Sequence, residues 1–139
     1  MTSAISAGGR TAGVTGTPLD TAYPAKNKRL QETLYRDHVL VSQFKKGERT
    51  FQSNFPKRNR LMALLSDATV VIEASDSSGT LHQASECLLL NRWLFIARSV
   101  AENTSLSWPA RFFPSERCRI LDSTEQLVST VYELPAIDA

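Results

Sequence analysis

The sequence has few of the residues that supply catalytic metals or covalent cross-links. It holds two cysteines and two histidines in 139 residues. The two cysteines, Cys87 and Cys118, are far apart in the sequence, and so are the two histidines, His38 and His82. None of the four has another ligand residue at metal-binding spacing, so the pattern favours reduced thiols over a metal site. No apolar run approaches the roughly 20 residues of a membrane span, and the first residues lack the basic start and apolar stretch of a signal peptide. These absences predict a cytoplasmic protein without metal, cofactor or membrane contact.

What the chain does have is segregated charge. The formal net charge is only +2, yet residues 1–60 carry 11 Lys or Arg against 4 Asp or Glu. Residues 61–139 carry 5 against 10. Within Lys45–Arg60 the count is six positive to one negative. A basic segment on an otherwise acidic chain indicates a local site for a polyanion.

Strand-like and helix-like apolar patterns alternate along the chain, which predicts an α/β fold with a mostly parallel sheet of about five strands and flanking helices. The unbroken run Ala68–Ile72 predicts a central strand covered on both faces. Residues 1–9 are expected to be disordered and residues 10–139 to form one domain. We expect strands near 10–15, 39–42, 69–73, 93–97 and 119–121, and helices near 25–36, 56–66, 80–90 and from 123 onward.

The helix predicted from Pro56 begins with unusual charge. Proline suits a first helical position, because its missing N–H would be unpaired there anyway. Lys57, Arg58 and Arg60 follow in the first turn, where the helix dipole disfavours each cation by roughly 0.3–1 kcal/mol. Beside the aromatic Phe55, these charges indicate an anion shared between them. A solvated basic helix end is an equally good interpretation of the spacing.

A second helix start follows the predicted central strand. Ser78 and Gly79 lead into a helix at Thr80, and free N–H groups at a helix start bind anions where glycine allows close approach. Ligands of doubly wound sheets lie at this end of the strands. The structural alternative is a capping box between Thr80 and Gln83, three residues apart.

The segments Asn54-Phe55-Pro56-x-Arg58-Asn59-Arg60 and Ser78-Gly79-Thr80-Leu81 together resemble the DNA-processing protein A family, also called Smf. That resemblance implies a Rossmann-like core that binds single-stranded DNA and helps load a RecA-type recombinase during natural transformation. It further implies that Phe55, Arg58 and Arg60 line the DNA groove beside Ser78 and Gly79. The family's opening strand and Gly-Ser-Arg turn have no counterpart here. We therefore expect an incomplete domain, completed by a homodimer or by a partner that supplies the missing strands.

The residues and the resemblance together predict a non-enzymatic protein that binds single-stranded DNA. One alternative is a nucleotide-binding or phosphoribohydrolase-like protein of the same superfamily, in which a Glu would stand at Gln83. An amide cannot act as a general acid or base, which weakens that alternative. Another is a degenerate domain that serves only as a protein-interaction surface. The expected DNA contacts are Lys45, Lys46, Phe55, Lys57, Arg58, Asn59, Arg60, Ser78, Gly79 and Thr80.

Overall fold

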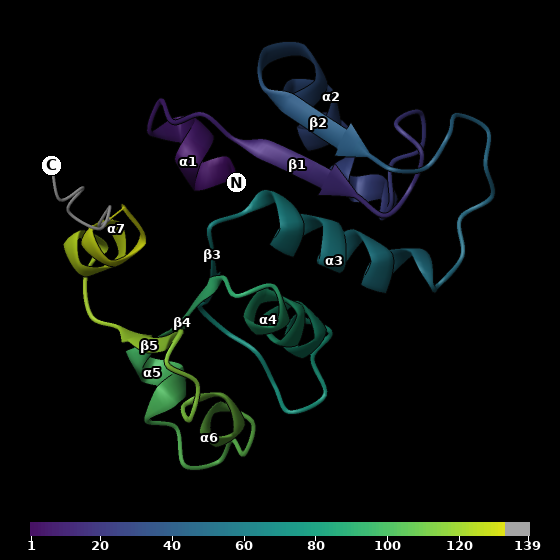
Figure 1. The fold of residues 1–139 in the computed structure, drawn as a ribbon. Helices are drawn as coiled ribbons and strands as arrows, with labels where there is room; N and C mark the ends of the chain where they lie inside the picture. The colour runs from purple at the N-terminus through teal and green to yellow at the C-terminus, as the bar shows by residue number, and fades with distance from the viewer. Residues whose placement is uncertain (133–139) are drawn as a thin grey trace, which may run out of the picture. The chain divides into compact units, whose positions relative to one another are not determined.

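The computed structural model of the chain describes residues 1–132 (Figure 1). It divides into two compact units, unit 1 from Met1 to Arg58 and unit 2 from Asn59 onward. Residues 10–139, which we expected to form one domain, thus contribute to both units. The boundary falls within helix α3 (Asn54–Leu65).

Unit 1 is built around a strand–helix–strand motif. Strand β1 (Ala12–Thr15) is parallel to β2 (Val39–Ser42), with Gly13 opposite Leu40 and Thr15 opposite Ser42. The connection consists of a short 3₁₀ helix, η1 (Ala25–Asn27), and α2 (Lys28–Asp37). Parallel strands need such a crossover, because a tight hairpin can join only antiparallel ones.

The packing of α2 on β1 depends on a glycine. Leu34 is the buried residue of α2, and a Cβ added at Gly13 would lie 2.7 Å from its Cδ1 atom. The loop after β1 is held by hydrogen bonds that satisfy buried polar groups. The Thr17 hydroxyl donates to the carbonyl of Thr21 (2.7 Å), and the Ser42 hydroxyl donates to that of Thr17 (2.7 Å). The end of β1 is therefore fixed to the end of β2.

The first nine residues, which we expected to be disordered, include a five-residue helix, α1 (Thr2–Ser6). Ala7 caps the end of the helix, and Gly8 follows with a φ of +75°, a conformation that glycine adopts without steric cost. The N–H groups of Gly8 and Gly9 donate to the carbonyls of Ile5 and Ala4, which satisfies acceptors at the helix end. These contacts are all local, and composition alone did not reveal them.

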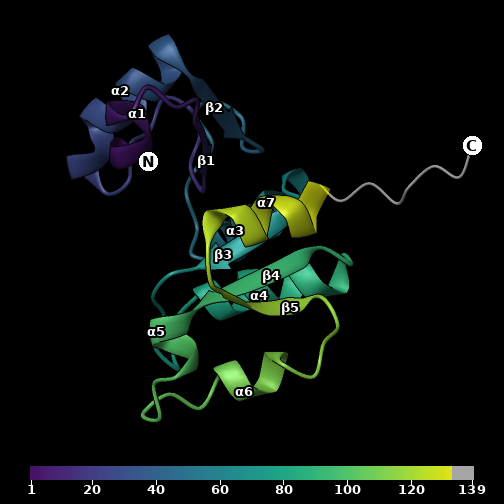
Figure 2. The same cartoon turned by 90° about the vertical axis from the view of Figure 1, so that its left-hand side faces the viewer.

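Unit 2 contains a three-stranded parallel sheet in the order β3 (Ala68–Val71), β4 (Trp93–Ala97), β5 (Cys118–Leu121). Helix α4 (Thr80–Leu89) connects β3 to β4. After β4 come α5 (Arg98–Ala101) and α6 (Pro109–Phe112), and α7 (Thr124–Tyr132) follows β5. Helices α4 and α7 lie on opposite sides of this sheet (Figures 1 and 2).

The core of unit 2 lies on the α4 side of the sheet. Leu94, Ile96 and Cys118 pack there with Cys87 of α4 and with Trp108, and each of these residues is buried. Trp108 precedes α6 and is fully buried. The short helices α5 and α6 form part of the connection from β4 to β5.

The α/β class, the parallel pairing and the five strands agree with the sequence prediction, but the strands form two sheets. Within unit 2, β3 is the outer strand of the three and β4 lies between β3 and β5. A continuous apolar run does not reveal which strands pair with its own, so it cannot distinguish an edge from a centre.

Candidate nucleic-acid interface

In unit 1, an aromatic and cationic cluster surrounds the start of α3. The rings of Tyr23 and Phe55 are 5.6 Å apart, and the guanidinium carbon of Arg58 lies 6.0 Å from the Phe55 ring centre. Phe55 packs on Gly16 so closely that a Cβ there would lie 2.8 Å from its Cδ1 atom. Tyr23 is 61% exposed, whereas Phe55 and Arg58 are half-buried. We call these three side chains the Tyr23–Phe55–Arg58 cluster.

Helix geometry explains why Phe55 and Arg58 meet. Helix α3 begins at Asn54, two residues before the predicted start, because the N–H groups of Asn54 and Phe55 find the carbonyls of Phe51 and Gln52. Phe55 is therefore helical, and it neighbours Arg58 because residues three apart on a helix lie side by side.

Arg58 is held at the base of the cluster. One guanidinium nitrogen donates to the carbonyl oxygen of Val14 at 3.3 Å. Burial disfavours the charged form and lowers the pKa of Arg58 from its usual value. An arginine stays charged despite such a shift. The cluster therefore holds a cation at a fixed position over the Phe55 ring. Such a pairing suits a nucleotide, which offers a π face and a phosphate together.

The predicted lysines of unit 1 are all exposed: Lys45 and Lys46 lie in the loop after β2, and Lys57 lies in α3. In the same loop Arg49 stacks on Phe51, with 5.7 Å from the guanidinium carbon to the ring centre. Lys46 also borders a cavity of about 780 Å³ between the loop after β1 and α2.

In unit 2 the two remaining predicted residues of α3 contact neighbouring elements. The Asn59 side-chain amide donates to the Gly79 carbonyl at 3.4 Å. Arg60 forms a 3.0 Å ion pair with Glu86 of α4. Such an exposed pair contributes about 0–1 kcal/mol, so a phosphate could replace the carboxylate at small cost.

The Ser78–Gly79–Thr80 turn lacks the capping box of the structural alternative. Gly79 is the N-cap of α4 and Thr80 is its first helical residue, so the capping box with Gln83 is not formed. Instead the Ser78 hydroxyl accepts the Thr80 N–H at 3.2 Å. The N–H groups of Leu81 and His82 donate to the carbonyls of Ser78 and Gly79. The donors that were expected to bind an anion thus already have partners within the turn.

The loop after β3 is fixed by Asp76, a residue that sequence reasoning left unassigned. Its carboxylate accepts hydrogen bonds from the Ser107 N–H (3.0 Å), the Ser107 hydroxyl (2.8 Å) and the Trp108 N–H (2.9 Å). These hydrogen bonds, above all the one from the Ser107 hydroxyl, lower the pKa of Asp76 from its usual value. The Trp108 indole N–H donates to the Ala74 carbonyl at 3.0 Å. The carboxyl end of β3 is therefore joined to the segment before α6.

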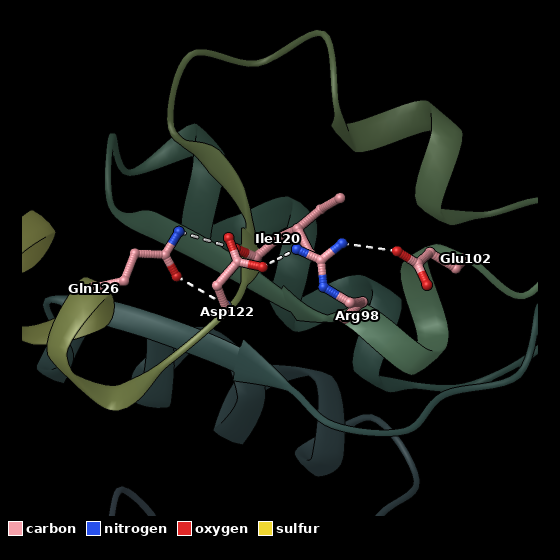
Figure 3. Close-up of polar contacts among 5 residues, drawn as sticks. All are labelled: Arg98, Glu102, Ile120, Asp122 and Gln126. Carbon is pink, nitrogen blue, oxygen red and sulfur yellow. Dashed lines mark hydrogen bonds and ion pairs between the residues drawn. The ribbon is translucent and has the colours of Figure 1, made fainter.

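A second fixed point lies at the carboxyl ends of β4 and β5 (Figure 3). Arg98 pairs with Glu102 at 2.7 Å and also with Asp122, which follows β5. Gln126 donates to the Ile120 carbonyl and accepts the Asp122 N–H. The Gln126 N–H in turn donates to the Ser123 hydroxyl, as expected of a helix cap at Ser123. Because two carboxylates pair with the one guanidinium of Arg98, we assign this cluster a structural role: it joins α5 to the end of β5.

Two other features limit the chemistry. Burial raises the pKa of the Cys118 thiol to about 11 and also raises that of Cys87, which disfavours the nucleophilic thiolate at neutral pH. Within residues 1–132, His, Cys, Asp and Glu do not gather in groups of three or more that could hold a metal. In the same part of the chain, no helix is long and apolar enough to cross a membrane.

The family model for DNA recombination-mediator protein A matches residues 1–130. The chain belongs to that family. DNA processing protein DprA of Streptococcus pneumoniae is 44% identical over 78 residues, which are 56% of this chain and 28% of the relative. Protein Smf of Synechocystis is 39% identical over 93 residues, or 67% of this chain and 23% of the relative. The chain thus spans about a quarter of the length of these curated relatives.

Solved structures of the family share the fold. The crystal structure of Streptococcus pneumoniae DNA processing protein A matches 92% of this chain and 45% of its own, with a TM-score of 0.80 and 31% identity. The Helicobacter pylori protein, described for its single-stranded DNA binding mode, matches 87% of this chain and 55% of its own. Its TM-score is 0.72 at 22% identity. The Rossmann-like α/β class is confirmed.

The ten expected contact residues are divided between the units. Unit 1 holds Phe55, Arg58 and the three lysines, while unit 2 holds Asn59, Arg60 and the Ser78–Thr80 turn. Sequence reasoning did not find Tyr23, the aromatic partner of Phe55. The available signal was an exposed Tyr-Pro pair in a loop, which has no fixed spacing to α3.

Proposed function

We propose that this chain binds single-stranded DNA without catalysing a reaction on it, in the manner of a recombination-mediator domain. The observation that carries the proposal is the Tyr23–Phe55–Arg58 cluster beside exposed lysines, in a member of a family named for DNA processing. Aromatic rings stack on any base, and cations attract the phosphate backbone, so this combination suits a single strand without sequence preference.

Each cluster member has a distinct role in the proposal. Tyr23 is the most exposed of the three and stacks on a base. Phe55 packs between Gly16 and the Tyr23 ring and provides a second aromatic ring. Arg58 attracts the adjacent phosphate, with Lys57 at the helix surface. Lys45 and Lys46 extend the positive surface along the loop. Asn59, Arg60 and the Ser78–Thr80 turn remain proposed contacts of unit 2.

The test is fluorescence anisotropy with a labelled single-stranded oligonucleotide at several salt concentrations. Phe55→Ala with Arg58→Ala is expected to weaken binding by at least tenfold, since stacking on one base contributes ~1–3 kcal/mol. Phe55→Leu keeps an apolar side chain against Gly16 and separates lost stacking from lost folding. Circular dichroism must show that each variant is folded.

The control removes two cations elsewhere in unit 1. Arg29→Ala with Arg36→Ala deletes two exposed side chains of α2 that do not line the cavity bordered by Lys46, and it is expected to leave affinity within about twofold. Equal losses in both double variants would reduce the proposal to general electrostatic attraction. Unchanged affinity in the cluster variant would sink it.

We extend the proposal to the partners that the family resemblance implies. We propose that the chain delivers the bound single-stranded DNA to a RecA-type recombinase. We also propose that it forms a homodimer or binds a partner that supplies further β-strands. Within unit 2, β3 has a strand neighbour on one side only, which supports an association, since an unpaired strand edge favours strand addition. Sedimentation across a concentration series tests it.

A further inference from the structure

Two arginines of unit 2 stack on one tryptophan. The guanidinium carbon of Arg117 lies 4.7 Å from the Trp93 ring centre, and that of Arg119 lies 5.3 Å from it. The three side chains border a cleft of about 710 Å³ that is completed by residues 113–116. We call Trp93, Arg117 and Arg119 the Trp93 cluster.

Strand register produces this arrangement. In the register of β4 and β5, Leu94 pairs with Cys118 and Phe95 pairs with Arg119. Trp93 and Arg117 precede the first of these pairs and therefore lie beside each other. Alternate residues of a strand share a face, which places Arg119 on the side of Trp93 and leaves Leu94 to the core. The cluster lies where β4 and β5 begin, at the opposite end of the sheet from Arg98 and Asp122.

Backbone contacts hold both arginines in place. The Arg117 N–H donates to the Ser115 hydroxyl at 3.3 Å, and its carbonyl accepts the Leu94 N–H at 2.8 Å. Arg119 donates from one guanidinium nitrogen to the Cys118 carbonyl at 2.9 Å. A site held by strands and a tight turn loses little freedom when a ligand binds.

Among residues 1–132, none of the ion pairs includes Arg117 or Arg119, whereas Arg60, Arg92 and Arg98 each face a carboxylate. A guanidinium has five donors in a fixed fork that matches a phosphate. Glu116 also borders the cleft, as a negative charge that a bound anion must oppose.

We propose that the Trp93 cluster is a second anion site, which binds a phosphate group of a single-stranded nucleic acid. This inference rests on the proposed function and adds a contact in unit 2 beyond the ten residues named above. Phosphate chemistry is favoured because arginines and an aromatic ring together serve both parts of a nucleotide. A free nucleotide carries the same group, so the test separates the two sources.

Intrinsic fluorescence gives a direct readout at this site. The chain has two tryptophans, and Trp108 is fully buried in the core. Titration of the full chain with a 20-nucleotide oligo-dT is expected to change Trp93 emission, and Trp93→Phe is expected to remove that change. Parallel titrations use dTMP and polyglutamate as the probes for a free nucleotide and for an acidic protein.

Anisotropy with the labelled oligonucleotide then tests the arginines. Arg117→Ala with Arg119→Ala is expected to weaken binding about tenfold and to lower the salt slope by about 1.4, for two lost phosphate contacts on a single strand. Arg117→Lys with Arg119→Lys keeps the charge but loses the fork, and is expected to be intermediate. Glu116→Gln is expected to strengthen binding. The control, Arg29→Ala with Arg36→Ala, removes two exposed charges from α2.

The outcomes separate this inference from the proposed function. If the wild type binds the oligonucleotide and the two double-alanine variants behave alike, the Trp93 cluster is not a site and the proposed function stands. If the wild type does not bind, both proposals are overturned. A Trp93 signal with dTMP alone reassigns the source to free nucleotides, and one with polyglutamate alone reassigns the cleft to an acidic protein. Both results overturn the inference.

Discussion

Replacing Trp108 with phenylalanine tests how unit 2 is held together. Trp108 is fully buried, its indole N–H donates to the Ala74 carbonyl at 3.0 Å, and its ring meets Phe112 edge-on with centres 5.8 Å apart. Phenylalanine keeps an aromatic ring in the core but cannot donate that hydrogen bond.

The expected cost has two parts. The Ala74 carbonyl loses its buried partner, which costs ~1–3 kcal/mol. Full truncation of a buried tryptophan costs ~3–5 kcal/mol, and the smaller loss of volume to phenylalanine is expected to contribute about 1 kcal/mol. The sum, about 2–4 kcal/mol, is a large part of the ~5–15 kcal/mol that stabilises a typical domain.

Urea unfolding followed by circular dichroism measures the change. Leu89→Ala is the control, because Leu89 of α4 is 79% exposed and its truncation is expected to change stability by no more than ~0.5 kcal/mol. A Trp108→Phe cost below about 1 kcal/mol, or one equal to the control, would refute the assignment of this hydrogen bond as a main support of the loop after β3.

Two further predictions concern the loops. Gly16→Ala is expected to displace Phe55 and to destabilise unit 1 by ~1–3 kcal/mol through overpacking, and so to weaken oligonucleotide binding. Gly79→Ala is the control: nothing lies within 4 Å of the added Cβ, so this variant should unfold at the same urea concentration as the wild type. Asp76 has a lowered pKa, so its contribution is present above the unfolded pKa near 3.9 and is lost as pH falls through the folded value. Asp76→Asn should therefore be less stable than wild type at pH 7, with the gap narrowing as pH falls below the unfolded pKa. A gap independent of pH contradicts the reasoning.

Local patterns predicted local structure well. Trp93–Ala97 is the strand expected from its bulky apolar residues, and α4 begins at Thr80 as expected. The start of α3 was placed two residues late, because the turn at Phe51 and Gln52 supplies acceptors that no helix signal encodes. Proline at position 56 tolerates either start, since it lies in the first turn in both.

Long-range pairing was beyond the sequence. The run Ala68–Ile72 contains no information about its neighbours, so the division of the strands between two sheets could not be predicted. The same limit applies to the candidate site. Helical spacing brings Phe55 to Arg58, but Tyr23 reaches Phe55 only through the fold of the loop after β1.

Both tryptophans belong to unit 2, whereas unit 1 has tyrosines as its largest chromophores. Emission excited selectively at tryptophan therefore follows the unfolding of unit 2 and is silent on unit 1. Circular dichroism follows the helices of both units. Coincidence of the two curves would indicate a single cooperative transition, and their separation would indicate two. In the second case, a free energy of unfolding obtained from tryptophan emission belongs to unit 2 alone, and the stability of the Tyr23–Phe55–Arg58 cluster must be measured by another probe.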